Sequence, residues 1–215
     1  MRIFLVTLAV STLAGVALWQ FGLAHRIWPS HPVLATVVIT AGCGIAAQMV
    51  ASHDAFTARI AEEPGFTVVG ISTRTTNAIE MSGQGVIGNE WDRFMKDGLL
   101  GKIPHRVDSS ILAVYTDYES DHSGAYAFIL GAKVSSRDNL PPGMVIKEVL
   151  PAKYAVFTSA RGLGAKVVPE CWQHINSLPK SAPGGDRTYR ADFEVYGPRA
   201  ADPRNAQVDI YIGIR

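Results

Sequence analysis

The chain has 215 residues, of which 47% are apolar and 18% are charged, so it can form one or two globular domains. Its formal net charge of +1 argues against a nucleic-acid surface built on a general excess of basic residues. The two cysteines, Cys43 and Cys171, lie far apart and indicate neither a disulfide framework nor a zinc site.

The first 51 residues are strongly apolar and contain two Arg but no Asp or Glu. Residues 3–24 carry no charge and are long enough to cross a bilayer, which needs about 20 apolar residues. Residues 33–51 are a second, weaker candidate, because Gly, Ala and Thr dilute the larger apolar side chains. The segment is interpreted as a membrane hairpin, which would anchor the protein to the inner membrane.

Two alternatives to the hairpin remain open. Residues 1–24 could be a signal peptide, although a single Arg precedes the apolar run and residues 33–51 would then be unexplained. The native protein could instead begin at Met49, so that residues 1–51 are largely a wrongly assigned extension and the protein is cytoplasmic.

Periodic sequence begins after a turn-rich linker at residues 62–66. The next elements are a strand, an amphipathic helix with Trp91 on its apolar stripe, and a hairpin of two strands. They are predicted at residues 66–76, 87–100, 109–119 and 124–134. Residues 139–143, "NLPPG", then break the chain.

The same order of elements is predicted a second time. A strand or bent pair of strands is followed by a helix carrying Trp172 and by two more strands. Their predicted ranges are 144–159, 166–179, 189–197 and 206–215.

The two halves also align in detail, with residues 113–118 matching 191–196 and Gly131 matching Gly213. An internal repeat of this kind predicts pseudo-twofold symmetry. We therefore expect an α+β domain over residues 60–215, built from a duplicated βαββ unit with copies at about 66–135 and 144–215. Antiparallel sheets would carry helices on one side and leave a central ligand pocket where the halves meet.

Three short motifs are interpreted as loops. Residues 83–88, "GQGVIG", fit a dinucleotide fingerprint, but a hairpin follows where a parallel βαβ unit is needed. Residues 161–166, "RGLGAK", lack the Lys–Ser/Thr pair of a phosphate loop. Residues 117–122, "DYESDH", lie at a predicted hairpin tip, where polar residues are common. We expect no cofactor and no metal ion.

Glu194 is the most unusual residue of the predicted strands, because it is a carboxylate in the middle of "YRADFEVYG". Alternation along the strand separates it from Phe193 and Val195. If the apolar faces pack under the helices, Glu194 and Tyr211 share the opposite face, at positions held by Thr116 and Ile129 in the first half. That face is either solvated or lines a groove, in which a carboxylate among aromatic rings would suit a cation.

Several segments together resemble the GyrI-like, AraC-type effector-binding domain family, in particular its stand-alone, integron-cassette branch. They include "FTVVGISTRTTN", "IGNEWDRF", "ILAVYTDYESDHSGAYAFILGAKVSS", "PPGMVIKEVLPAKYAVFTSARG" and "DFEVYG". The resemblance covers about residues 60–215. Members of this branch usually lack the apolar segment, which favours a start at Met49.

The resemblance implies a pocket between the repeats that binds small, often cationic, aromatic compounds. It implies that Glu194 is the counter-charge and that Tyr211 and Trp91 are aromatic walls. Further candidates for the wall are Tyr118, Tyr196 and Trp172.

The chain departs from the family's DNA-binding regulators, because no helix-turn-helix precedes residue 60. We therefore expect no direct nucleic-acid binding, and action in transcription regulation or drug response through a partner protein. Two alternatives are a hydrolase of strained or electrophilic small molecules, with Glu194 as general base, and an interaction protein of the gyrase-inhibitor type.

Overall fold

The computed structural model describes residues 58–179, 181 and 184–215. The predictions for residues 1–51 and for a start at Met49 lie outside these residues. In the described part of the chain, no helix is both long and apolar enough to cross a membrane.

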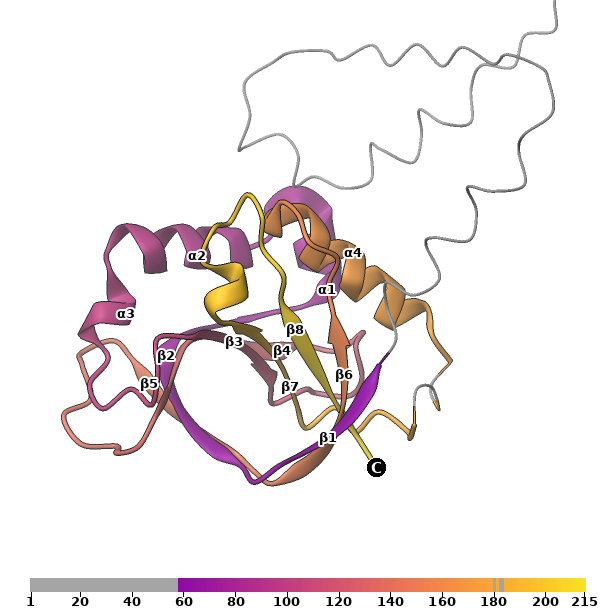
Figure 1. Ribbon diagram of the computed structural model, residues 1–215, viewed down its shortest axis with the longest axis horizontal. Helices are drawn as coiled ribbons and strands as arrows, with labels where there is room; N and C mark the ends of the chain where they lie inside the picture. Colours follow the sequence, from indigo (N-terminus) through magenta and orange to yellow (C-terminus); the bar gives the residue numbers. More distant parts are fainter. Residues whose placement is uncertain (1–57, 180, 182–183) are drawn as a thin grey trace, which may run out of the picture.

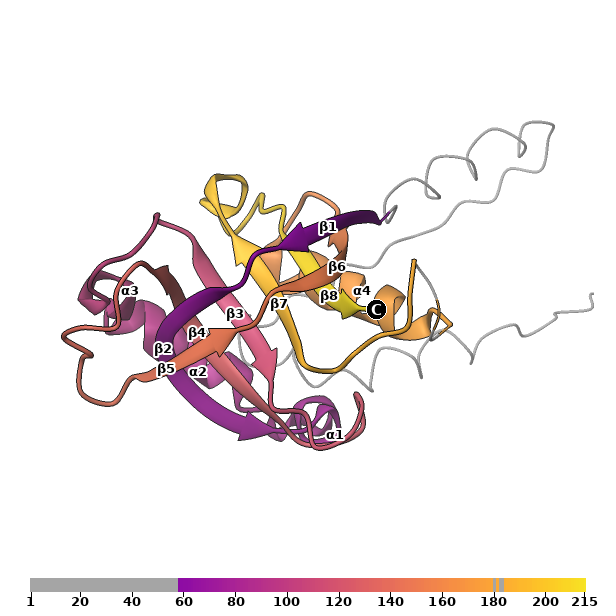
Figure 2. The same ribbon diagram turned by 90° about the horizontal axis from the view of Figure 1, so that it is seen from below.

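Eight strands form one antiparallel sheet in the order β1-β6-β8-β7-β3-β4-β2-β5. The helices α1–α4 lie on one side of it, and the sheet curves strongly on the other side (Figure 1). The same arrangement seen from below shows the strands in front of the helices (Figure 2). The architecture is therefore α+β, as predicted.

The first half of the chain follows the predicted order of elements. In chain order they are β1 (Arg59–Glu63), β2 (Phe66–Thr75), α1 (Asn77–Ile79), the π-helical turn η1 (Glu80–Gln84), α2 (Ile87–Lys96), α3 (Leu99–Lys102), β3 (Ile111–Thr116) and β4 (Tyr126–Val134). The predicted helix at 87–100 is divided at Gly98, whose φ of 60° is left-handed.

The second half contains the other four strands and the longest of the described helices, α4. In chain order the elements are β5 (Val145–Val149), β6 (Ala152–Thr158), α4 (Gly164–Ser177), β7 (Ala191–Tyr196), the 3₁₀ turn η2 (Pro198–Ala200) and β8 (Asp209–Ile214). Of the two alternatives predicted for 144–159, one strand or a bent pair of strands, the structure has the pair, β5 and β6.

Two expectations about the sheet were wrong. The linker predicted at 62–66 overlaps β1, an edge strand whose sequence "RIAEE" does not alternate and which is fixed by pairing with β6. The two predicted sheets are one, because β3 and β7 pair along six residues each, from Ile111↔Tyr196 to Thr116↔Ala191. This pairing brings the two halves together in the middle of the sheet.

The sheet buries apolar side chains on both faces. Val69, Phe94 and Leu130 belong to a core under α2 and α3, and Val168 and Ile210 to a core under α4. The opposite face holds a third cluster around Phe66, Val68, Val114, Tyr154 and Phe193. Because both faces are covered, apolar alternation in a strand does not reveal which face meets the helices.

A side-chain cap fixes the start of α2, the helix that carries Trp91. The carboxylate of Glu80 accepts hydrogen bonds from the backbone N–H groups of Val86 and Ile87, at 3.0 and 3.2 Å. It also accepts one from the Thr75 hydroxyl at 2.6 Å. A carboxylate at a helix N-terminus satisfies free N–H groups and complements the helix dipole.

Candidate functional site

Glu194 is 2% exposed and lies at the centre of a hydrogen-bonded cage. Its Oε1 accepts hydrogen bonds from the Tyr115 hydroxyl at 2.8 Å and from Trp172 Nε1 at 2.5 Å. Its Oε2 accepts one from the Tyr196 hydroxyl at 2.6 Å. All three donors are neutral, so the cage satisfies the acceptors of the carboxylate without neutralising its charge.

The cage is assembled where the two halves of the chain meet. Glu194 and Tyr196 come from β7, and Tyr115 comes from the neighbouring strand β3. Trp172 comes from α4, which covers this face of the sheet. The residues belong to three elements that only the folded sheet brings together.

Burial controls the protonation of this site. Loss of solvent raises the pKa of Glu194 above its ordinary value, and the hydrogen bonds from Tyr196, Trp172 and Tyr115 oppose that rise. Burial, and then the charge of Glu194, also raise the pKa of the hydroxyls of Tyr115 and Tyr196 well above their ordinary value. The tyrosines therefore remain protonated donors at neutral pH.

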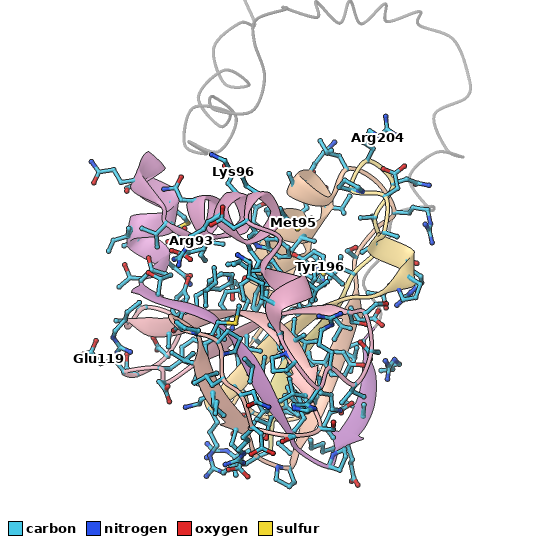
Figure 3. The ribbon with its side chains drawn as sticks, turned by 90° about the vertical axis from the view of Figure 1, so that its left-hand side faces the viewer. Arg93, Met95, Lys96, Glu119, Tyr196 and Arg204 are labelled. Carbon is cyan, nitrogen blue, oxygen red and sulfur yellow. The ribbon has the colours of Figure 1, made fainter. Side chains whose placement is uncertain are left out.

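More aromatic rings surround the cage. Tyr115 contacts Trp172 with ring centroids 5.1 Å apart, and it contacts Phe128 at 5.3 Å. Trp91 of α2 packs edge-on against Tyr196 at 4.7 Å. Figure 3 shows Tyr196 at the level between the helices and the sheet, whereas Lys96 and Arg204 project from the surface.

A second buried carboxylate lies two residues before Glu194. Asp192 is 0% exposed. It accepts hydrogen bonds from the Tyr118 hydroxyl and the Gly213 N–H, each at 2.8 Å. It also forms an ion pair with Arg187, whose Nη2 lies 2.7 Å from Asp192 Oδ2. Asp192 therefore has a cationic partner within the protein.

Tyr211 does not share a face with Glu194, and that expectation was wrong. In the register of β7 and β8, Tyr211 lies opposite Phe193, and Glu194 lies opposite Ile210. The Tyr211 ring stacks on Phe193 with centroids 4.4 Å apart, in the cluster on the face away from the helices. Glu194 faces the helices, because its partner Trp172 lies on α4.

The proposed equivalence of Thr116 with Glu194 fails for the same reason. Thr116 alternates with Val114 of the cluster away from the helices, so it points to the face opposite Glu194. The expected pairing of Thr116 with Ile129 on one face is compatible with this cluster, which contains Ile129. Tyr115, next to Thr116 on β3, faces the helices, as does Ala113.

The six candidate residues thus divide into three groups. The first group is Glu194 with Trp172 and Tyr196, which donate hydrogen bonds to it, and with Trp91, which packs on Tyr196. Tyr118 belongs to the neighbouring Asp192 cluster, and Tyr211 lies on the other face.

Sequence reasoning missed Tyr115, Asp192 and Arg187. Alternation along β7 does place Asp192 on the face of Glu194, since residues two apart share a face, but it indicates no role for Asp192. No local pattern connects Tyr115 to Glu194, because they are 79 positions apart in the chain.

The cage is closed in this structure. A small cavity of about 60 Å³ lies near the C-terminal half of α4 and is lined by Asn176, Arg187 and Tyr189 among others, but not by Glu194. Ligand pockets for drug-sized molecules usually enclose roughly 300–1,000 Å³. Across the described residues, no group of three or more His, Cys, Asp or Glu side chains is arranged to hold a metal ion.

A sequence profile of integron-associated effector binding proteins matches residues 59–214. The chain belongs to this family. The match confirms the resemblance to GyrI-like effector-binding proteins on nearly all of the described residues.

Three known proteins illustrate the relationship. YobU of Bacillus subtilis, named as a transcriptional regulator, is 38% identical over 148 residues, which are 68% of this chain and 90% of YobU. The integron cassette protein VCH_CASS2 of Vibrio cholerae is 34% identical with a TM-score of 0.58, covering 74% of this chain and 97% of that protein. SAV2435, solved bound to tetraphenylphosphonium, has a TM-score of 0.62 over 74% of this chain and 93% of its own. At 16% identity, SAV2435 shows a shared fold alone.

Proposed function

We propose that this protein is an effector-binding module for amphipathic, aromatic cations and that Glu194 supplies the counter-charge. The observation that carries the proposal is the buried Glu194 carboxylate. It is held by three neutral donors, and no Lys, Arg or His side chain of residues 58–179, 181 and 184–215 forms an ion pair with it.

A cation in this cage would relieve an electrostatic penalty of the empty protein. An unpaired charge in a protein interior costs several kcal/mol, even after relaxation and partial hydration. Each aromatic ring that faces the cation adds about 0.5–2 kcal/mol of attraction. Trp172, Tyr115 and Tyr196 lie at the carboxylate with their N–H and O–H edges toward it, so they would present ring faces to the cation only after the rotation proposed below.

Ligand entry requires the cage to open. Trp91 and Trp172 come from two helices on the same side of the sheet, and their rings cover Tyr196 and Glu194. We propose that these two helices separate, or that these side chains rotate, when a ligand replaces the indole N–H at Glu194. Such rearrangements are common in regulatory binding proteins.

We also propose that residues 60–215 form one effector-binding domain built from two related βαββ units. The strand order supports this, because β6-β8-β7 and β2-β4-β3 have the same internal order and meet at β7 and β3. The relative named as a transcriptional regulator supports a regulatory role, which we propose is exerted through a partner protein.

The test is a titration of the full chain with tetraphenylphosphonium, in which isothermal titration calorimetry measures the affinity. We expect Glu194→Gln to weaken binding at least tenfold, since the variant keeps the size and shape of the side chain and removes its charge, with one acceptor oxygen replaced by an amide donor. Tyr211→Phe is the matched control, because Tyr211 lies on the opposite face of the sheet. Equal affinity of the wild type and the Glu194→Gln variant would remove Glu194 from this role.

A further inference from the structure

Two buried acids occupy the helix-facing side of β7. Asp192 and Glu194 are 0% and 2% exposed. Because they are two residues apart on one strand, their Cα atoms are about 6.6 Å apart. A cation that reaches one of them is therefore within the field of the other.

Among the residues that the structure describes, only Asp192 has a cationic partner. Arg187 donates to Asp192 from Nε and Nη2, and from Nη1 to the Asn176 side chain. Its side chain is only 11% exposed. Burial lowers the pKa of Arg187, but the charge and hydrogen bonds of Asp192 together with Tyr118 and Tyr189 more than offset this, so the guanidinium stays protonated.

Trp172 lies between the two charge systems. Its Nε1 donates to Glu194, and its ring lies 5.7 Å from the Arg187 guanidinium carbon. The same guanidinium carbon lies 4.7 Å from the centroid of the Tyr189 ring. Arg187 is therefore held one indole ring away from Glu194, in a position set by two rings and by Asp192.

Glu80 is a further acid near the aromatic cluster, since its charge raises the pKa of Tyr126 after the larger effect of burial. Its carboxylate is engaged by the Thr75 hydroxyl and by the N-terminus of α2. Glu80 therefore belongs to the cap of α2 and is not part of β7. Of the two buried acids on β7, Glu194 is the one without a cationic partner among the described residues.

We propose that Arg187 and Asp192 are specificity-determining residues that set the charge of the ligand: by cancelling each other, they leave one negative charge at Glu194 and restrict the site to singly charged cations. This inference rests on the proposed function, because it describes the charge selection of the same site. Neither Arg187 nor Asp192 touches the ligand; each acts through the field at Glu194.

The test compares two flat aromatic probes of nearly equal size, N-methyl-4,4′-bipyridinium with one charge and N,N′-dimethyl-4,4′-bipyridinium with two. Affinities of the full chain for both are measured by calorimetry at pH 7.5. The wild type should prefer the singly charged probe. Asp192→Asn frees the charge of Arg187 and should weaken binding of that probe about tenfold, the size expected for a unit charge at this range in a partly screened site.

The compensating variant separates charge from structural damage. Asp192→Asn combined with Arg187→Gln removes both charges, so it should return the affinity for the singly charged probe to within about threefold of the wild type. Arg187→Gln alone leaves Asp192 unbalanced and should shift the preference toward the doubly charged probe. Circular dichroism spectra verify that each variant is folded. If a single variant does not fold, the test rests on the double variant and on the preference of the wild type for the singly charged probe.

The outcomes distinguish this inference from the proposed function. A wild type that binds either probe independently of Glu194 overturns the proposed function and the inference with it. Binding that depends on Glu194 but does not prefer the singly charged probe overturns the inference alone. The same holds if the double variant binds as weakly as Asp192→Asn, since the pair would then act through structure and not through charge.

Discussion

Replacing Glu194 by Gln should stabilise the empty protein at neutral pH, although it removes a residue at the centre of the site. The carboxylate is 2% exposed, and burial is the largest influence on its pKa, which is raised despite three hydrogen bonds to the charged form. The charged form is therefore less favourable in the folded protein than in the unfolded chain. Gln preserves the shape of the side chain and removes the charge.

The sign of the pH dependence follows from this raised pKa. Below the ordinary Glu pKa of about 4.3, both the folded and the unfolded states hold the proton and there is no penalty. As the pH rises, the unfolded chain loses its proton first, so the free energy of unfolding falls until the pH passes the folded-state pKa. Above that value the penalty is constant.

The magnitude is set by the size of the pKa shift, because each unit corresponds to about 1.4 kcal/mol. We expect the Glu194→Gln variant to be more stable than the wild type at pH 8, and we expect this difference in the free energy of unfolding to shrink as the pH falls toward 5. For a protein of this size, 1 kcal/mol changes the melting temperature by about 2–4 °C.

The assay is urea denaturation of the full chain at pH 5 and pH 8, followed by far-ultraviolet circular dichroism. Tryptophan fluorescence is avoided, because Trp172 contacts Glu194 directly. Glu119→Gln is the control for the loss of one negative charge, since Glu119 is exposed at the β3–β4 hairpin (Figure 3). The reasoning would be refuted if the difference in the free energy of unfolding between variant and wild type were the same at pH 5 and pH 8. It would also be refuted if the advantage of the variant were smaller at pH 8 than at pH 5.

Two further predictions concern the cage and the sheet. Tyr115→Phe should destabilise the protein by about 1–2 kcal/mol at pH 8 and by less at pH 5, because it removes a donor from the charged form of Glu194; an equal loss at both pH values in denaturation curves would contradict this. Gly131→Ala should lower stability by about 3 kcal/mol or more, because its Cβ would overlap the backbone carbonyl oxygen of Val69 on the paired strand, which cannot move aside. Thermal unfolding measures that loss, and a melting temperature within 3 °C of the wild type would show that the sheet can relax there.

The local pattern of the sequence determined the order of the elements well. Residues 66–76, 109–119 and 124–134 were predicted as strands and contain β2, β3 and β4. Their β-branched and aromatic side chains, bounded by turn residues, favour strands whatever the rest of the chain does. The edge strand β1 was missed, since its residues are charged and take their conformation from hydrogen bonds to β6.

The sequence also singled out Glu194, because a carboxylate in the middle of an apolar strand is unusual at any position. It could not show which face Glu194 occupies. Phe193 and Glu194 alternate on β7, and both are buried, at 2% each. In a sheet with one solvent-exposed face, Phe193 would lie under the helices and Glu194 would face the solvent. This sheet does not follow that rule, because apolar side chains cover both of its faces.

The partners of Glu194 and the balance of charge around it were decided by the tertiary structure alone. Tyr115 reaches Glu194 because β3 pairs with β7, and Trp172 reaches it because α4 crosses the same face. Arg187 neutralises Asp192 and not Glu194, although the two acids are only two residues apart. Sequence pattern records which side chains are present and how they alternate, whereas hydrogen bonds and ion pairs depend on distances of about 3 Å that only the packed chain fixes.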